Sequence, residues 1–563
     1  MTHASTIGRP GPAVGTESVV CIALVLDAWE QPRWVADALR EALSSGTVSV
    51  CAVGLVGPDH GTPSGAEPLQ PVTASSWLAR LYSAADRMRF QPDESPFAPE
   101  SLRPLVGGVP TSQLTAGVLA GGGDTSRVFG EGQRPDLVLN LSARQETARL
   151  AGAAPMGAFA FVLGDRSLPL GDEVGVREVM HGEPVIRVRL DRWTRAEGQA
   201  TTVVETVTNT HPFSAGRTRA IAARHASTLL ARLGRTLVDG RRDGSHPLAP
   251  AAGPATATAR SARTTGIAGG LLRLAARYVR YLAAGRRARD QWVLAYHRGD
   301  ADDAPFPPPE RRLSQYRKLI PPGDRFWADP FPLRVDGREF LLFEELVFAE
   351  DVGHLSVIEL GPDGPLGEPT TVLQRPFHLS YPFTFEFDGQ WYLLPEMALE
   401  GRLELYRAVR APYEWVLDRV IMEGPMLMDA TLEEIDGKWW MFASEYREGL
   451  QPWTDLLVFH ADSPFGPWTP HPRNPVVSDV RSARPAGRLF RENGVWLRPA
   501  QDCSRTYGGA ITLRRITTLS PTDYAEEAAS YIAADGSSGW KGPHTLNAHR
   551  GLSAIDLKRS VPS

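Results

Sequence analysis

The chain has 563 residues, which is too long for one ordinary hydrophobic core and predicts two or three domains. Its hydrophobic fraction of 42% and charged fraction of 22% exclude a fibrous or wholly disordered protein. The formal net charge of −5 gives no general basis for binding nucleic acid, so we expect no nucleic-acid partner.

The three cysteines, Cys21, Cys51 and Cys503, have neither a metal-ligand spacing nor the pattern of a disulfide framework. Cys21 and Cys51 each lie in an apolar run, where we expect separate buried thiols. Residues 1–17 lack the features of a secretory signal, and no apolar run reaches the roughly 18 residues that a transmembrane helix needs. These features predict a cytoplasmic protein.

Residues 18–235 have the alternating strand and helix patterns of a doubly wound α/β domain. Apolar runs at 18–26 and 48–56 predict strands buried on both faces of a parallel sheet. The glycine-rich stretch 117–123 lacks the spacing of a nucleotide-binding loop, and we expect an ordinary loop. The other expected elements are helices at 34–43 and 77–88 and a strand at 135–141.

Two segments are expected to connect this domain to the rest of the chain. Residues 236–265 predict a disordered linker, because Pro, Ala, Gly and Thr dominate without apolar periodicity. Residues 266–290 predict a basic amphipathic helix, and two interpretations of its 271–289 region are open. Either the helix makes peripheral contact with an anionic membrane surface, or it packs within the protein with its arginines in water. Its expected apolar face consists of Leu271, Leu272, Ala275, Tyr278, Val279 and Leu282.

A short pattern recurs in the second half of the chain, namely an Asp-Gly or Asn-Gly pair between apolar and aromatic residues. Such a pair is the strongest short-range signal for a β-hairpin, because Gly accepts a positive φ. Hairpins that recur about every 50 residues indicate a β-propeller with one hairpin per blade. The first residues of the four turns are Asp336, Asp388, Asp436 and Asn493.

The ends of this region predict how the ring closes. An isolated strand at 291–296 precedes the first repeat, and the strand near 552–557 has no full hairpin after it. We expect these two strands to share one blade, because closure removes free sheet edges. Residues 291–557 are therefore expected to form an all-β, five-bladed propeller.

The repeat also predicts which residues face the central funnel. Asp329, Tyr381 and Asp429 each lie seven residues before a turn Asp. This is the point where we expect the innermost strand of each blade to begin. The irregular fourth and fifth repeats offer Arg484 and His544. Such a mixture of charged and polar side chains is unlike a packed apolar core.

Paired carboxyl groups at a channel mouth suit glycosidic chemistry, which needs one protonated acid and one ionised base or nucleophile. The structural alternative is that these acids pair with arginines and backbone amides and make the ring rigid. Asp329, Asp502 and His544 have no local metal-ligand spacing, so we expect no metal and no cofactor. The candidate catalytic residues are Asp329, Asp429, Glu396 and Asp502, and the candidate substrate-binding residues are Trp327, Tyr381, Glu345, Arg484, Gln501, Tyr507 and His544.

The segments 327–331 and 428–430, with the Asp-Gly hairpins, resemble the five-bladed propeller glycosidases of the arabinanase and β-xylosidase type. This resemblance implies a catalytic role for Asp329 and a pKa-modulating role for Asp429. The family's general-acid Glu would lie where this chain has Arg484 and no Glu. The resemblance then requires a substitute acid, which would be Glu396, Glu445 or Asp502.

Residues 310–557 more closely resemble the propeller-like N-terminal domain of glucosamine inositolphosphorylceramide transferases, through the segments 498–502, 507–508 and 542–547. This resemblance implies a glycan or glycolipid partner without fixing the reaction. The sequence indicates no oligomeric state.

The first 235 residues resemble the formyltransferase fold in the order of their elements. Where that family has an Asn and a His, this chain has apolar residues that include Phe159 and Phe161. A phenylalanine cannot polarise a formyl group or carry a proton, so we expect this domain to serve binding or assembly.

Taken together, these patterns predict a carbohydrate-active enzyme that binds a sugar or glycoconjugate in the propeller funnel and cleaves or transfers a glycosidic linkage. Two alternatives remain open. One is a non-catalytic glycan- or glycolipid-binding propeller. The other is a formyl or acyl transferase that uses the propeller for recognition.

Overall fold

The computed structural model describes most of the chain and divides it into two compact units. The first unit consists of residues 1–174, 187–205 and 222–263, and the second of 175–186, 206–221 and 264–563. The described residues are 19–57, 77–90, 95–114, 129, 134–142, 146–164, 166–167, 174–196, 199–243, 266–284, 288–299, 313–534 and 539–562.

The N-terminal region contains an eight-stranded mixed sheet in the order β10-β9-β7-β6-β1-β3-β5, and the short strand β8 also pairs with β7. The chain winds outward from β1 in both directions through parallel pairs, β1–β3–β5 on one side and β1–β6–β7 on the other. The expected α/β sheet is therefore present, with antiparallel strands added beyond β7. Its strands are β1 (Val20–Leu26), β3 (Val48–Val56), β5 (Thr111–Leu114), β6 (Leu137–Asn140), β7 (Ala158–Leu163), β8 (Arg166–Ser167), β9 (Val185–Trp193) and β10 (Thr201–Asn209).

Helices and a small ribbon complete this region. The expected helices near 34–43 and 77–88 are present as α1 and α2. The ribbon pairs β2 (Glu30–Pro32) with β4 (Pro99–Ser101). The helices are α1 (Arg33–Ser44), α2 (Trp77–Phe90), α3 (Arg103–Val106), α6 (Val176–His181), α7 (Ala215–Asp243) and α8 (Gly266–Ala284), with a 3₁₀ turn at Thr147–Leu150.

Two expectations for this region were wrong. Cys21 and Cys51 form a disulfide instead of remaining separate thiols, because β1 and β3 are neighbours and bring their Cα atoms to 5.9 Å. Helix α7 continues to Asp243, so residues 236–243 are helical and not part of a disordered linker. The remainder of the expected linker and the glycine-rich stretch 117–123 lie outside the described residues.

The second half of the chain is a five-bladed propeller, as expected. Each of the first four blades is a sheet of consecutive antiparallel strands. The first blade contains β13 (Arg325–Val335), β14 (Arg338–Val347), β15 (Gly353–Gly361), β16 (Gly364–Pro365) and β17 (Thr370–Leu373), and the second contains β18 (Ser380–Phe387), β19 (Gln390–Glu396), β20 (Arg402–Arg410) and β21 (Glu414–Glu423). The third contains β22 (Leu427–Ile435), β23 (Lys438–Glu445), β24 (Asp455–Ala461), β25 (Thr469–Pro470) and β26 (Val477–Ser478), and the fourth contains β27 (Phe490–Glu492), β28 (Val495–Asp502), β29 (Ala510–Leu519) and β30 (Tyr524–Ile532).

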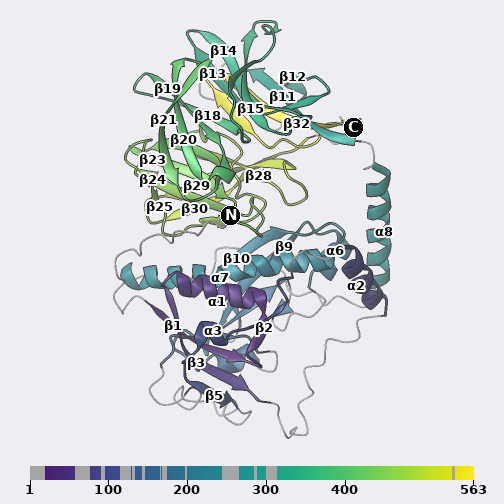
Figure 1. The fold of residues 1–563 in the computed structure, drawn as a ribbon, viewed down its shortest axis with the longest axis vertical. Helices are drawn as coiled ribbons and strands as arrows, with labels where there is room; N and C mark the ends of the chain where they lie inside the picture. Colours follow the sequence, from purple (N-terminus) through teal and green to yellow (C-terminus); the bar gives the residue numbers. More distant parts are fainter. Residues whose placement is uncertain are drawn as a thin grey trace. The chain divides into compact units, whose positions relative to one another are not determined.

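The fifth blade joins the two ends of the propeller sequence, in the order β12-β11-β32-β31. Strand β11 (Ala288–Arg298) pairs along its whole length with β32 (Leu552–Pro562), and Figure 1 shows the teal and yellow strands side by side. The outer strand is β12 (Arg317–Leu319) and the inner strand is β31 (Leu546–His549). The predicted closure of the ring is confirmed.

The repeated turns have the backbone that the sequence demands. Asp336, Asp388, Asp436 and Asn493 have φ between 50° and 53°, and the glycine after each also has a positive φ. Positive φ at both central residues defines the tight turn whose twist matches that of paired strands. Each hairpin therefore fixes the register of its blade from the turn inward.

Candidate functional site

Three equivalent residues on the innermost strands share an unusual backbone conformation. Asp329, Tyr381 and Asp429 have φ of 51°, 43° and 52°. Each lies where the pairing of its strand with the next strand shifts register, as in a β-bulge. A residue with a side chain pays about 1–3 kcal/mol to hold a sparsely populated conformation. The bulge turns each residue out of the regular ladder at the same point in three blades, as the count from the turns predicted.

Asp329 is 5% exposed and is surrounded by hydrogen-bond donors. Its carboxylate accepts from the backbone N–H of Tyr381 at 3.2 Å and from the hydroxyl of Thr545. His544 Nε2 lies 3.5 Å from Asp329 Oδ1. The Asp329 side chain thus joins the first blade to the second and the fifth.

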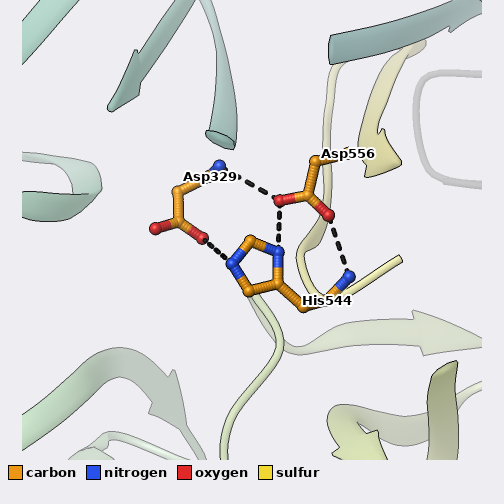
Figure 2. Close-up of side chains that lie close together, drawn as sticks. All are labelled: Asp329, His544 and Asp556. Atoms are coloured by element: carbon orange, nitrogen blue, oxygen red, sulfur yellow. Dashed lines mark hydrogen bonds and ion pairs between the residues drawn. The ribbon is translucent and has the colours of Figure 1, made fainter. Parts of the chain in front are cut away.

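His544 is held between two carboxylates, as Figure 2 shows. Its Nδ1 lies 2.5 Å from Asp556 Oδ2, which also accepts from the backbone N–H of Asp329 at 3.1 Å. The other oxygen of Asp556 accepts from the backbone N–H groups of His544 and Thr545, at 2.8 and 3.0 Å. The imidazole stacks on Trp292 with ring centroids 4.0 Å apart. These contacts fix the ring orientation and aim Nε2 at Asp329.

The environment tunes both titratable groups of this pair. Burial is the largest effect on Asp329, and its pKa is raised to about 7. The charge of His544 lowers this pKa, whereas the charges of Glu344, Asp556 and Asp429 raise it. Burial opposes the charge on His544, but Asp556 and Asp329 outweigh it and raise the pKa of His544. Asp329 can therefore take up and release a proton near neutral pH.

Asp429 lies in an ion pair with the arginine of the fourth blade. Arg484 Nε lies 2.5 Å from Asp429 Oδ2, and Arg484 Nη2 donates to Oδ1 at 3.3 Å. Gln501 donates to Asp429 Oδ2 at 3.2 Å and to the carbonyl of Pro485 at 2.9 Å. All three side chains are at least 95% buried. A buried pair with two-pronged geometry holds Asp429 and Arg484 in one fixed arrangement.

Glu396 lies next to this ion pair and contacts both of its members. Its Oε2 accepts from the backbone N–H of Asp429 at 2.9 Å, and Arg484 Nη2 lies 3.9 Å from the same oxygen. Burial and the nearby charge of Asp429 raise the pKa of Glu396 well above its ordinary value, although Arg484 acts in the opposite direction. The protonated form of Glu396 is therefore favoured relative to that of an ordinary glutamate in water.

Tyr507 joins the two halves of the cluster. The guanidinium of Arg484 lies 5.0 Å from the centre of its ring, and His544 meets the same ring edge-on at 5.2 Å. Trp453 stacks near it at 6.1 Å. Tyr381 lies in the same region, and its hydroxyl shares a 2.7 Å hydrogen bond with Thr431. We call these side chains the mouth cluster, because the sequence predicts several of them at the mouth of the funnel. They are Asp329, Tyr381, Glu396, Asp429, Arg484, Gln501, Tyr507, His544, Thr545 and Asp556.

The structure places three other predicted site residues in separate networks. Trp327 Nε1 donates to Glu345 at 3.1 Å, and Arg325 and Ser356 also bond to that carboxylate. Burial alone would raise the pKa of Glu345, but its hydrogen bonds with His354, Ser356, Trp327 and Arg325 lower it to about 2. Asp502 accepts from the hydroxyl of Tyr531 at 3.1 Å and from the backbone N–H of Ser504 at 2.9 Å. Trp327, Glu345 and Asp502 are bonded to these partners and not to the mouth cluster.

The sequence analysis missed three members or neighbours of the cluster. Asp556, fully buried, lies on β32, which was considered only as the closing strand. The signal was a carboxylate inside the apolar run Ala554-Ile555-Asp556-Leu557, where an unpaired charge is costly. Thr545 and Trp292 have no comparable signal in the sequence.

The group Asp329, His544 and Asp556 also has the geometry of a metal-binding set. Each residue offers one ligand atom, and these atoms lie within 4.8 Å of one another. One imidazole nitrogen and two carboxylate oxygens could hold a divalent cation. The sequence analysis considered Asp329, His544 and Asp502 together. In the structure the third residue beside Asp329 and His544 is Asp556, not Asp502.

Comparison with known proteins shows that the propeller region is similar to part of a known family. Residues 320–558 match the family model described as glucosamine inositolphosphorylceramide transferase 1, N-terminal. The C-terminal region is thus similar to the N-terminal part of these transferases. A protein of that name from Oryza sativa subsp. japonica is 39% identical over 206 residues, and one from Arabidopsis thaliana is 36% identical over 228 residues. The matches cover 36% and 38% of this chain and only 27% and 29% of those proteins.

Solved structures of glycosidases also align with this chain. A family 117 glycoside hydrolase from Zobellia galactanivorans aligns with 48% of this chain and 90% of its own, at 14% identity and a TM-score of 0.30. An exo-β-1,3-galactanase from Phanerochaete chrysosporium aligns with 43% of this chain and 65% of its own, also at 14% identity and a TM-score of 0.30.

Proposed function

We propose that this protein binds the sugar part of a glycan or glycolipid at the mouth of the propeller and cleaves or transfers a glycosidic linkage there. The observation that carries the proposal is that two carboxyl groups, Asp329 and Glu396, both have raised pKa values and both feel the charge of Asp429, which is paired with Arg484. The similarity of residues 320–558 to proteins named as glycolipid glycosyltransferases supports a carbohydrate-related substrate.

The two carboxyl groups suit complementary roles. Glu396 would donate its proton to the glycosidic oxygen as the bond to the anomeric carbon breaks. Asp329 would accept the proton of the attacking hydroxyl, from water or from a second sugar, as the new C–O bond forms. One proton leaves Glu396 and one arrives at Asp329, so the charge of the site is conserved.

The neighbours of these two groups would support the reaction without joining it. The pair of His544 and Asp556 keeps the proton affinity of Asp329 near neutrality and orients its carboxylate. Burial, and after it the negative charge of Asp429, raises the pKa of Glu396 and so favours its protonated form. Arg484, which stands where the sequence resemblance to propeller glycosidases would place an acid, balances the charge of Asp429.

A second candidate function is glycan or glycolipid binding without catalysis. The ion pair between Arg484 and Asp429 favours it, because a fully paired carboxylate at a channel mouth also makes a rigid binding surface. Tyr507 with Trp453 would offer aromatic faces to a sugar ring.

The test compares turnover and binding in the full-length protein on aryl glycosides, natural glycans and glycolipids. Asp329→Asn should lower kcat by about 100- to 10,000-fold and leave substrate affinity nearly unchanged, because only the proton transfer is lost. Asp462→Asn is the matched control, since the side chain of Asp462 is 93% exposed and pairs with Lys438 on the surface of the propeller. The absence of turnover on every substrate, with tight glycan binding in wild type and variant, would favour the second candidate.

For the N-terminal region we infer a binding or assembly role. Phe159 and Phe161, which the resemblance to formyltransferases would place at that family's catalytic positions, are fully buried in β7. Buried phenyl rings support packing and offer no group for proton transfer. Formyl or acyl transfer by the full-length protein from a folate or acyl donor would contradict this inference.

A further inference from the structure

Helix α8 packs one of its sides tightly against its own unit. It runs from Gly266 to Ala284 beside α6 (Figure 1). A methyl group added at Gly270 would lie 2.9 Å from Met180 Cβ, so the two helices are in close contact. Leu274 is only 8% exposed. Arg277 bonds to the carbonyls of Val179 and Pro212.

Aromatic contacts fix the same side further along the helix. Phe213 meets the ring of Tyr278 at 5.3 Å and the ring of Tyr281 at 5.1 Å. The side of α8 that includes Leu274, Arg277 and Tyr278 is therefore occupied by the protein itself. The sequence analysis had placed Tyr278 on a single apolar face with Leu272, and the structure separates the two.

The opposite side of α8 is apolar and exposed. Leu272 is 73% exposed, Val279 64% and Leu282 38%. With 3.6 residues per turn, positions 272, 279 and 282 fall along one stripe of the helix. Ala275, Ala276 and Ala283 are also exposed. On this wheel Ala275 lies between Val279 and Leu282, and Ala276 and Ala283 extend the stripe beyond Leu272 toward Arg280. An exposed apolar stripe on an ordered helix marks an interaction surface.

The charges around this stripe are all positive. Arg273 and Arg280 are exposed and lie seven residues apart, on one border of the stripe. The helix from Gly266 to Ala284 contains no Asp or Glu. Two further arginines, Arg286 and Arg287, follow it in the sequence. A partner for this surface must therefore be apolar at its centre and negatively charged beside it.

We propose that α8 is a docking helix for an anionic membrane surface. Leu272, Val279 and Leu282 would enter the boundary between headgroups and acyl chains, and Arg273 and Arg280 would contact lipid phosphates. The packed side of α8 keeps the helix ordered before it meets the lipid, so little conformational entropy is lost on binding. No described helix is long and apolar enough to cross a bilayer. An apolar stripe bordered by arginines is the pattern of a helix that lies in the membrane interface. This proposal does not depend on the chemistry proposed for the propeller.

The experiment measures co-sedimentation of the full-length protein with vesicles of phosphatidylcholine alone and of phosphatidylcholine mixed with phosphatidylserine. The wild type should bind the mixed vesicles, and binding should weaken as salt is added, because salt screens the arginines. The double variant Leu272→Glu with Val279→Glu should lose about tenfold or more in binding, because two charges would enter the apolar boundary. The double variant Arg273→Gln with Arg280→Gln should lose the preference for the anionic vesicles.

Matched controls separate docking from misfolding. Leu399→Glu with Val409→Glu makes the same chemical change at two positions that are 71% and 59% exposed on the propeller, and it should bind as the wild type does. All variants are checked for an unchanged thermal unfolding midpoint. Wild-type protein that binds neither vesicle, or a Leu272→Glu, Val279→Glu variant that binds equally well, would overturn the proposal. Self-association that this variant abolishes, without vesicle binding, would assign the stripe to a second copy of the chain.

Discussion

The chemistry of single residues in the mouth cluster follows from burial. Asp329 is 5% exposed and lies near three other carboxylates, so its charged form is disfavoured. The charge of His544 acts in the opposite direction, and the pKa of Asp329 is about 7. An acid with its pKa near neutrality can act as a base and as an acid within one reaction cycle.

This shift predicts a pH dependence of stability at the residue scale. The folded-state pKa of Asp329, about 7, is above its ordinary value of 3.8, so the folded protein binds the proton more tightly than the unfolded chain. The stabilisation from protonated Asp329 is full below pH 3.8 and is lost as the pH rises to about 7. Asn cannot ionise, so Asp329→Asn should gain stability relative to the wild type across this window, as measured by urea unfolding.

Asp462→Asn is the control for this experiment. Lys438 lowers the pKa of the exposed Asp462, so its charged form is the stabilised one. The wild type should therefore gain slightly over this variant as the pH rises, which is the opposite sign. A difference between Asp329→Asn and wild type that stays constant with pH would contradict the raised pKa of Asp329.

Some of these residues could be predicted from the sequence because their positions follow from local rules. The Asp-Gly turn fixes the hairpin, and the hairpin fixes Asp329, Tyr381 and Asp429 at the same distance from it. Asp556 could not be predicted in this way, because its strand is paired with β11, at the other end of the propeller sequence. Its role depends on a contact that only ring closure creates.

Elements of the fourth blade are joined by one buried arginine. Arg498 on β28 makes two 2.9 Å bonds to Glu526 on β30 and donates to the carbonyl of Ser482 at 2.6 Å. Arg498 is fully buried and the Glu526 side chain is 3% exposed. This network compensates for the short innermost strand β27, which has only three residues. The blade that carries Arg484 and Gln501 is thus held by charge as well as by its strands.

This network predicts unequal costs for two similar substitutions on neighbouring strands. Arg498→Met should lower the free energy of unfolding by about 3 kcal/mol, because it leaves a buried carboxylate with Arg514 as its remaining cation. Arg515→Met breaks a 3.0 Å ion pair with Glu527 in which both side chains are at least half exposed, and it should cost about 1 kcal/mol or less. Equal losses in urea unfolding would contradict the structural role of Arg498.

At the scale of elements, the sequence predicted the strands that follow from a local apolar pattern. It did not predict the features that depend on which elements are neighbours in the folded protein. The strands β1 and β3 were expected from their apolar runs. Their adjacency, which brings Cys21 to Cys51, depends on strand order and could not be derived from spacing along the chain. Helix α7 continues to Asp243 although Gly240 lowers the helix propensity of its last turns.

At the scale of the whole molecule, ring closure assembles the mouth cluster from all five blades. Asp329 comes from the first blade and Glu396 from the second, while Asp429 and Arg484 come from the third and fourth. His544 precedes the inner strand of the closing blade. No two of these residues are neighbours in the sequence, so the site exists only in the closed propeller. The number of blades and the closing strands were predictable, because five units with paired ends leave no free edge.

The most direct test of the account is the dependence of Glu396→Gln on the leaving group of the substrate. A glycoside with a good leaving group, such as a nitrophenol, needs no proton, whereas an alkyl or natural glycoside does. The variant should lose about 100- to 10,000-fold in kcat/KM on the poor leaving group and about tenfold or less on the good one. Asp502→Asn, whose carboxylate bonds to Tyr531 outside the cluster, should retain activity on both. Equal losses of Glu396→Gln on the two substrates, or no loss on either, would contradict Glu396 as the proton donor of this propeller.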